Sequence, residues 1–485
     1  MKRLVKNIAD WIDFRLGIRD VLLPLMLHPT PSGSRWWYVF GSSALSMLLL
    51  QIVTGVCLAL VYVPSAGDAY NTLNYLTFQQ PLGWLIRAIH NYAATAMLVL
   101  MIAHMIQVFL MGSFKFPREM TWLIGVALLI LTLGMAFTGQ VLRWDQDAYW
   151  GLGVGAAMLG RVPYIGPELV RMMLGGPIIG ADTLSRFFAL HVFVIPGLLL
   201  TSLTVHLWLV LRHGVSEPPV AGRLVSPVTY AASYEKVLKR GEGFFPAAVM
   251  RDVIFSSLAV IVVVVISAVL GPKGPSQPPD PAVVAAEPRP DWYFLSAFAL
   301  LALSPPDLET AIILGLPVIL LAALVLVPFI AGKGERSPRR RPIAVLTVIL
   351  GLATYGVLTW LGHTAPWSPQ MNAWSGAPVP PQIVKKLRPL ELQGAVVFQN
   401  KSCRNCHALD GVGGQRGPDL TYVAASLNQA EMTRQVIQGG GNMPGFAQHL
   451  SPAEVTALVA FLERLRPEKA LPPRPEPGVS ATRNR

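Results

Sequence analysis

Seven apolar stretches, each long enough to cross a lipid bilayer as a helix, dominate this chain of 485 residues. A helix crosses the hydrocarbon core in about 20 residues, and each stretch reaches that length between charged positions. Only 14% of the residues are charged and 53% are hydrophobic, whereas soluble domains carry about 25% charged residues. A wholly soluble enzyme, a disordered chain and a collagen are therefore excluded. The predicted spans lie near 36–62, 83–111, 120–141, 186–211, 248–270, 308–331 and 342–362.

The basic residues predict which way the chain is oriented. The formal net charge is +12, but Lys and Arg gather in short loops beside the apolar stretches, so no nucleic-acid partner is predicted. Nineteen of them fall on the side of the N-terminus and six in the opposite loops, and the positive-inside rule therefore places the N-terminus in the cytoplasm. Seven spans then leave the C-terminal domain outside. We expect a multi-pass protein of the bacterial inner membrane, with that domain on the periplasmic side.

The order of spans and loops predicts an all-α chain with a membrane part and a small soluble part. The stretch 11–19 (WIDFRLGIR) is too charged to span and is typical of an amphipathic helix on the membrane surface. A proline-rich external loop occupies 271–290. The predicted units are an N-terminal surface segment at 1–35, a four-span module at 36–213, a cytoplasmic connection at 214–247, a three-span module at 248–362, a linker at 363–385, a soluble domain at 386–467 and a disordered tail at 468–485.

Four histidines lie inside predicted spans, where ionisable residues are costly and usually functional. His90 and His104 are 14 residues apart, almost four helical turns, so both lie on one face of the second span. His191 and His206 are 15 apart in the fourth span, and a local distortion around Pro196 and Gly197 would bring them onto one face. Two such helices facing each other offer one histidine pair near each membrane surface, an arrangement that binds two stacked haems. The alternative is that the histidines line a water cavity or bond to neighbouring helices.

Glycines repeat with the same spacing on two other spans. Gly41 and Gly55 are 14 residues apart in the first span, and so are Gly125 and Gly139 in the third. A bulky macrocycle inside a bundle needs missing side chains where it presses on a neighbouring helix, and glycine provides that space. Glycine is common in membrane spans, so this spacing supports the histidine pattern without standing alone.

The soluble domain carries the attachment motif of c-type haem. Cys403, Cys406 and His407 have the Cys-X-X-Cys-His spacing in which two thiols bond to the haem and the histidine ligates its iron. A redox or zinc Cys-X-X-Cys is the alternative. Met443 is the predicted sixth ligand, or otherwise a core methionine. Helices are expected at 387–399 and 452–465.

The membrane part resembles the cytochrome b subunits of quinol:cytochrome c reductases, the cytochrome bc complexes. The resemblance rests on the four histidines, the paired glycines and four motifs. These motifs are LIRAIH at 85–90, FPREMTW at 116–122, WDQDAYWG at 144–151 and PDWYFL at 290–295. The 15-residue histidine spacing and the three later spans look like the chloroplast type, with its b chain and subunit IV fused here. Gly417 and Pro418 match the loop that supports the histidine in class I cytochromes c.

The resemblance implies three haems. His90 and His191 would ligate a non-covalent b haem nearer the outside, and His104 and His206 a second one nearer the cytoplasm. One covalent c haem would follow in the soluble domain. No cysteine lies near Val39, where chloroplast-type proteins attach a further haem, so none is expected in the membrane.

The resemblance also implies that quinol is oxidised at an external site. Asp291 stands where the family usually has glutamate, and it is the expected proton acceptor, with Trp292 and Tyr293 beside it and Tyr149 lining the same pocket. Relatives with aspartate use menaquinol, which hints at the substrate. The alternative makes Asp291 a helix N-cap. Arg143 departs from the proline of the family, so the floor of this site is expected to differ.

Charged residues near the spans receive roles from the same resemblance. Arg251 and Asp252 match the pair at the cytoplasmic quinone-reduction site, or are otherwise a juxtamembrane charge pair. Arg87 and Arg118 are candidates to pair with haem propionates, or otherwise orient the helix ends.

The function implied is that of a membrane quinol:cytochrome c oxidoreductase subunit contributing to a proton gradient. One electron would pass to a separate Rieske iron-sulfur protein and on to cytochrome c, because the chain lacks the Rieske motifs, and the other would cross the membrane to a second quinone. A homodimer within a larger complex and a downstream cytochrome c or terminal oxidase are expected. Two alternatives remain: a dihaem anchor relaying electrons between a dehydrogenase and quinone, and a transporter-like bundle with a tethered cytochrome.

Overall fold

The computed structural model describes residues 2–176, 179–280, 289–364, 378–413, 417–439, 443, 445–447 and 449–467. Seven helices among them are long and apolar enough to cross a membrane, as the sequence predicts, and their ends lie within a few residues of the expected ones. These spans are Phe40–Ala59 (α3), Gly83–Leu110 (α5), Glu119–Val141 (α6), Ala181–His213 (α9, η2 and α10), Phe244–Leu270 (η3 and α12), Leu308–Ala331 (within α14, Pro306–Ala331) and Pro342–Thr364 (α15).

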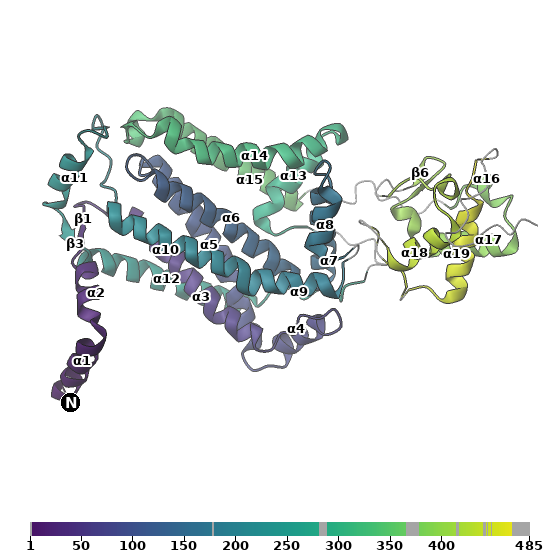
Figure 1. The fold of residues 1–485 in the computed structure, drawn as a ribbon, viewed down its shortest axis with the longest axis horizontal. Helices are drawn as coiled ribbons and strands as arrows, with labels where there is room; N and C mark the ends of the chain where they lie inside the picture. The colour runs from purple at the N-terminus through teal and green to yellow at the C-terminus, as the bar shows by residue number, and fades with distance from the viewer. Residues whose placement is uncertain are drawn as a thin grey trace, which may run out of the picture.

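The shorter elements gather at the two ends of the bundle (Figure 1). One end, here called the C-domain end, carries α4 (Ala69–Phe78), α7 (Gln146–Gly160), α8 (Gly166–Leu174), η4 (Trp292–Phe294) and α13 (Leu295–Leu303). The opposite, N-terminal end carries α1 (Lys2–Leu16), α2 (Ile18–Met26), η1 (Trp36–Tyr38), α11 (Tyr230–Leu238) and η5 (Pro338–Arg340). Two short antiparallel ladders also lie there, β1 (Pro29–Thr30) with β3 (Glu242–Gly243) and β2 (Leu224–Val225) with β4 (Gly334–Glu335).

The fourth span contains a π-helical turn that the sequence pattern placed too late in the chain. The expected site was Pro196 and Gly197, but the widened turn is η2 (Leu190–Val194), between α9 (Ala181–Ala189) and α10 (Ile195–His213). A π turn accommodates one extra residue, so the 15 residues from His191 to His206 cover the angle that 14 cover in a regular helix. Both histidines therefore lie on one face of the span.

Apolar side chains from four spans form the centre of the bundle. The buried cluster contains Met47 of α3, Met97 of α5, Leu199 of α10 and Val263 of α12 (Val249–Leu270). Most other apolar side chains of the spans are exposed, as is usual for helices whose outer faces contact lipid acyl chains. The helices that carry the histidines are thus held together around one shared interior.

Buried charged residues join the two membrane modules at the N-terminal end. Arg336 forms an ion pair with Glu217 at 2.7 Å, and both side chains are less than a tenth exposed. The ammonium of Lys115, from the loop between α5 and α6, donates to the backbone carbonyls of Ala331 and Lys333. Because these carbonyls follow the last turn of α14, Lys115 caps that helix from the first module.

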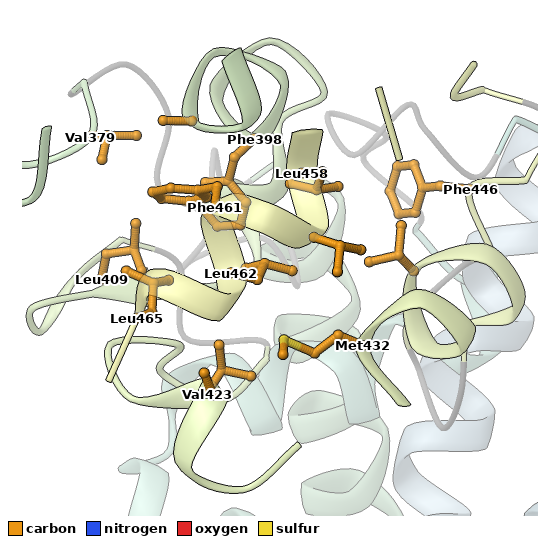
Figure 2. Packing of buried hydrophobic residues seen from close by; sticks show 14 of the residues in the cluster. Val379, Phe398, Leu409, Val423, Met432, Phe446, Leu458, Phe461, Leu462 and Leu465 are labelled. Atoms are coloured by element: carbon orange, nitrogen blue, oxygen red, sulfur yellow. The ribbon is translucent and has the colours of Figure 1, made fainter. Parts of the chain in front are cut away.

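The C-terminal domain is a small helical unit with its own core (Figure 2). Phe398 of α17 (Pro389–Asn400) packs on Phe461 of α19 (Pro452–Arg464), with ring centroids 5.5 Å apart. A side chain at Gly394 would collide with the carbonyl of Ala457, so glycine allows these two helices to touch. The remaining elements are α16 (Pro381–Val384), η6 (Cys403–Asn405), β5 (Ala408–Leu409), β6 (Val412–Gly413), η7 (Val423–Ala425) and α18 (Gln429–Gln438). The predicted tail at 468–485 and much of the linker lie outside the described residues.

Candidate functional site

His90 and His191 face each other inside the bundle, toward its C-domain end. Their ring centroids are 6.4 Å apart and their planes meet at 73°. Metal–imidazole nitrogen bonds are roughly 2 Å long, so this separation suits one metal ion held between the two rings. His90 comes from α5 and His191 from the π turn of the fourth span, as the sequence pattern predicts.

The hydrogen bonds of these two histidines determine which ring nitrogen is free. The Thr54 hydroxyl donates to the carbonyl of Leu50 and lies 2.9 Å from Nδ1 of His90, so the hydroxyl oxygen can only accept from the ring. Nδ1 must therefore carry the proton, which leaves Nε2 with a free lone pair. Thr138 does the same for His191, at 3.0 Å, while donating to Gly134. Second-shell bonds of this kind orient histidines that ligate metals.

The second pair, His104 and His206, lies deeper toward the N-terminal end of the same two spans. The two side chains are close enough to interact electrostatically. Nδ1 of His104 is buried and has no hydrogen-bond partner among the described residues. The two pairs thus differ in their surroundings: only the first is oriented by threonine hydroxyls.

Each of the four paired glycines lies against one of the four histidine rings. A methyl group on Gly55 would come within 3.2 Å of His90, and one on Gly139 within 2.7 Å of His191. At the other level, a methyl group on Gly41 would approach His104 to 3.3 Å and one on Gly125 would approach His206 to 3.6 Å. Glycine therefore keeps space open at both histidine levels. The free ring nitrogens and this space fit a haem at each level, and no described feature blocks it.

Asp291 lies at the C-domain end, at the start of η4. Its side chain makes no capping hydrogen bond, so the structure does not support the N-cap alternative. Instead the Tyr293 hydroxyl donates to Oδ2 of Asp291 at 3.0 Å, and the ammonium of Lys273 lies 3.7 Å from Oδ1. Burial, followed by the negative charge of Asp291, raises the pKa of Tyr293, so this phenol keeps its proton.

Aromatic side chains surround this carboxylate and its neighbours. Trp292 packs edge-on against Tyr293 and Tyr355, and its indole nitrogen is buried without a partner among the described residues. Tyr149 of α7 packs against Trp150, and burial together with the charge of Asp280 raises its pKa to about 12. The predicted site residues are thus apolar-faced with polar tips, which suits an amphipathic quinol.

The loop at 271–280 is fixed by several polar contacts that the sequence did not predict. Asp145, fully buried, accepts from the amide of Ser276 at 2.9 Å and from the guanidinium of Arg143. The side chain of Gln146 exchanges two hydrogen bonds with the backbone of Asp280. Arg143 was noted only as a departure from proline; here it pairs with the carboxylate that anchors the loop.

Both arginines proposed for propionates are engaged with protein acceptors. Arg87 donates to the Thr77 hydroxyl and to the carbonyls of Lys273 and Gly274. Arg118 is bonded to the carbonyls at 213 and 214 and to a tyrosine hydroxyl. Their roles at propionates stay predictions.

Arg251 and Asp252 lie in the first turn of α12, at the N-terminal end. Asp252 interacts with Arg251 and with Ser42 of α3, and Ser43 hydrogen-bonds to Ser256 nearby at 3.1 Å. A role in quinone reduction and a juxtamembrane charge pair both remain compatible with these contacts.

The residues of the Cys-X-X-Cys-His motif are held as an attachment site requires. Nδ1 of His407 lies 2.8 Å from the carbonyl of Pro418, an acceptor, so Nδ1 carries the proton and Nε2 is free. A side chain on Gly417 would overlap the His407 ring, which explains the glycine there. Burial and the neighbouring Cys406 raise the pKa of Cys403 to about 12. These residues fit a covalently bound haem.

Met443 and His449 come from the segment that follows α18. Met443 packs against the domain core, with its sulfur 3.7 Å from the side-chain amide of Gln435. His449 lies 3.3 Å from Asp280 of the loop at 271–280, so the C-terminal domain contacts the C-domain end of the bundle. Ligation by Met443 stays a prediction beside the alternative of a core methionine.

An all-helical membrane bundle with two histidine pairs in its interior, followed by a helical domain with a Cys-X-X-Cys-His motif, defines a membrane cytochrome with an attached c-type domain. Three family models match the chain. "Cytochrome b/b6/petB" matches residues 25–214, "Cytochrome b(C-terminal)/b6/petD" matches 278–376, and "Cytochrome C oxidase, cbb3-type, subunit III" matches 390–462.

Named relatives agree with these matches. Cytochrome b6 of Synechococcus sp. (strain JA-3-3Ab) is 36% identical over 214 residues, which cover 44% of this chain and 100% of that protein. Cytochrome b of Rhodobacter capsulatus is 29% identical over 375 residues, covering 73% of this chain and 84% of that protein. A solved structure titled "Hyperthermophilic respiratory Complex III" has a TM-score of 0.63 and 25% identity, over 82% of this chain and 96% of that one. The chain belongs to the cytochrome b/b6 family and carries a C-terminal cytochrome c domain.

Proposed function

We propose that this chain is the membrane subunit of a quinol:cytochrome c reductase that oxidises quinol at its C-domain end. One electron would go to a separate Rieske protein and on to cytochrome c, and the other across the membrane to a quinone at the N-terminal end. When bound, haems at the two histidine levels and at the Cys-X-X-Cys-His motif would supply one-electron chemistry. The observation that carries the proposal is the convergence of four histidines and four glycines at two levels of one bundle.

The residues around Asp291 support a site for quinol oxidation at this end. The carboxylate is the proton acceptor in this proposal, and Tyr293 and Lys273 hold its two oxygens in place. Trp292 and Tyr149 supply flat apolar surface for a quinol ring. Because the c-type domain contacts the same end through His449, the site for oxidation and the exit for one electron lie on one side.

The orientation follows from the charges. The N-terminal end carries the excess of Lys and Arg, so we assign it to the cytoplasm and the C-domain end to the periplasm of a bacterial inner membrane. Arg251 and Asp252 would then supply protons to the quinone that is reduced there. A homodimer within a larger complex completes the proposal.

Replacing Asp291 tests the proposed site. Asp291→Asn removes the proton acceptor but keeps the shape, so the rate of quinol-dependent cytochrome c reduction by the purified complex should fall by at least about 100-fold. Asp182→Asn, an exposed aspartate at the same end, is the matched control and should keep the full rate. Haem content should be unchanged in both. A full rate in Asp291→Asn would overturn the assignment of the base.

A further inference from the structure

We infer that Lys273 is a positioning residue for quinol oxidation: its ammonium holds the carboxylate of Asp291 in a fixed orientation. This inference rests on the proposed function and deepens it. Lys273 was assigned no role by the sequence beyond its charge. It is 18 residues from Asp291 in the chain and belongs to the other end of the same external loop.

The two oxygens of Asp291 are held by different partners. The ammonium of Lys273 lies 3.7 Å from Oδ1, while the hydroxyl of Tyr293 donates to Oδ2 at 3.0 Å. The side chain of Asp291 is 19% exposed, so most of it is removed from water, whereas that of Lys273 is 49% exposed. A carboxylate held at both oxygens presents a fixed lone-pair direction to an incoming hydroxyl group, which lowers the entropy cost of proton transfer.

An exposed lysine would ordinarily sample many conformations, so its usefulness depends on how firmly its backbone is held. The guanidinium of Arg87 donates to the carbonyls of both Lys273 and Gly274. Arg87 is only 6% exposed and also donates to the Thr77 hydroxyl, so it is itself fixed. The main chain of Lys273 is thereby tied to α5.

The next residues of the loop are fixed as well. Gly274 adopts a φ of +59°, which favours glycine, and a side chain there would come within 3.1 Å of Asp145. Asp145 accepts from the amide of Ser276, and the Tyr70 hydroxyl donates to the carbonyl of Ser276 at 2.8 Å. With both neighbours of the turn immobilised, the lysine stem starts from a defined place and direction.

The same contacts link the lysine to the histidine pair at this end. Arg87 precedes His90 by three residues, so both lie on one face of α5 about one turn apart. A single helix therefore places one of the proposed haem ligands and, through Arg87, the loop that presents Lys273. Movement of α5 would shift both the histidine and the orientation of Asp291.

The test compares Lys273→Gln with Lys273→Arg in the purified complex, with a short-chain menaquinol analogue as the substrate. An ion pair of this exposure supports a change of about three- to fivefold in rate, so Lys273→Gln should lower kcat by that factor and leave KM unchanged. Lys273→Arg keeps the cation and should restore kcat. Rates are expressed per b haem, so partial assembly does not obscure the comparison.

Two further variants separate this inference from the proposed function. Lys239→Gln removes a lysine paired with Glu235 at the opposite end of the bundle and should leave kcat unchanged. The double variant Lys273→Gln/Asp291→Asn should be no slower than Asp291→Asn alone, because Lys273 acts only through Asp291. If Asp291→Asn loses activity but Lys273→Gln keeps full kcat, the role of Lys273 is refuted and the site stands. If Asp291→Asn keeps full activity, both are refuted.

Discussion

The hydroxyl oxygen of Thr138 lies 3.0 Å from Nδ1 of His191 and, because it donates its own proton to Gly134, it can only accept from the ring. This relationship fixes the imidazole tautomer and directs the free lone pair of Nε2 into the bundle. A ring nitrogen that donates to such an acceptor makes the opposite nitrogen a better electron donor to a metal. The threonine is therefore expected to tune whatever His191 ligates.

Thr138→Val should raise the midpoint potential of one b haem. Loss of the acceptor makes His191 a weaker donor to ferric iron, and a tenfold change in relative affinity corresponds to a shift on the order of 60 mV. Thr132→Val is the control, since Thr132 is buried on the same helix and its hydroxyl has no partner among the described residues. A spectroelectrochemical titration measures both. Equal shifts in the two variants would contradict the role of Thr138.

Alanine at Gly139 should disturb its histidine more than alanine at Gly125. A methyl group would come within 2.7 Å of His191 at the first position but only within 3.6 Å of His206, an ordinary contact, at the second. We expect Gly139→Ala to lower the occupancy of one b haem or change its spectrum, and Gly125→Ala to leave the other nearly unchanged. The reverse order would show that the glycines serve helix packing instead. The measurement is the absorbance of each b haem per c haem.

Met443→Ala should keep the covalent haem while lowering its potential. The two thiols and His407 are untouched, but loss of a thioether ligand removes the group that raises the potential. Axial ligands span a range of roughly 0.8 V, so the shift should be readily measured by redox titration of the c-type band. An unchanged potential would assign Met443 to the core of the domain.

Glu217→Gln should destabilise the protein by about 3–5 kcal/mol, because it leaves Arg336 as a buried charge without its partner. The pair is 2.7 Å long and both side chains are nearly inaccessible to water. Replacing both residues, as Glu217→Leu/Arg336→Met, should recover much of the loss. Thermal unfolding in detergent, followed by the b-haem spectrum, compares the three proteins. Equal losses in the single and double variants would mean that the ion pair itself supplies the stability.

The sequence predicted the spans and the histidine faces because apolar length and helical period are local properties. It misplaced the distortion of the fourth span: Pro196 suggested a break there, whereas the turn widens at Leu190–Val194. Proline disfavours helix in the residue before it, but which turn yields is decided by packing against neighbouring helices. The periodicity of 15 residues showed only that a distortion was needed.

The sequence could not predict how the loop at 271–280 is fixed. Its contacts with Arg87, Asp145 and Gln146 join residues more than 100 positions apart, and no local pattern encodes such pairs. The departure at Arg143 was the one available signal. The pairing of Lys273 with Asp291 was hidden for the same reason, since the intervening residues carry no regular period.

The central claim is that two facing histidine pairs each hold one b haem, and a haem count on the purified protein tests it most directly. Wild-type protein should show two b haems for each c haem, and His191→Ala should show one. His206→Ala should also show one, but the remaining b haem should have a different midpoint potential from that left in His191→Ala. Two b haems retained in either variant would contradict the account.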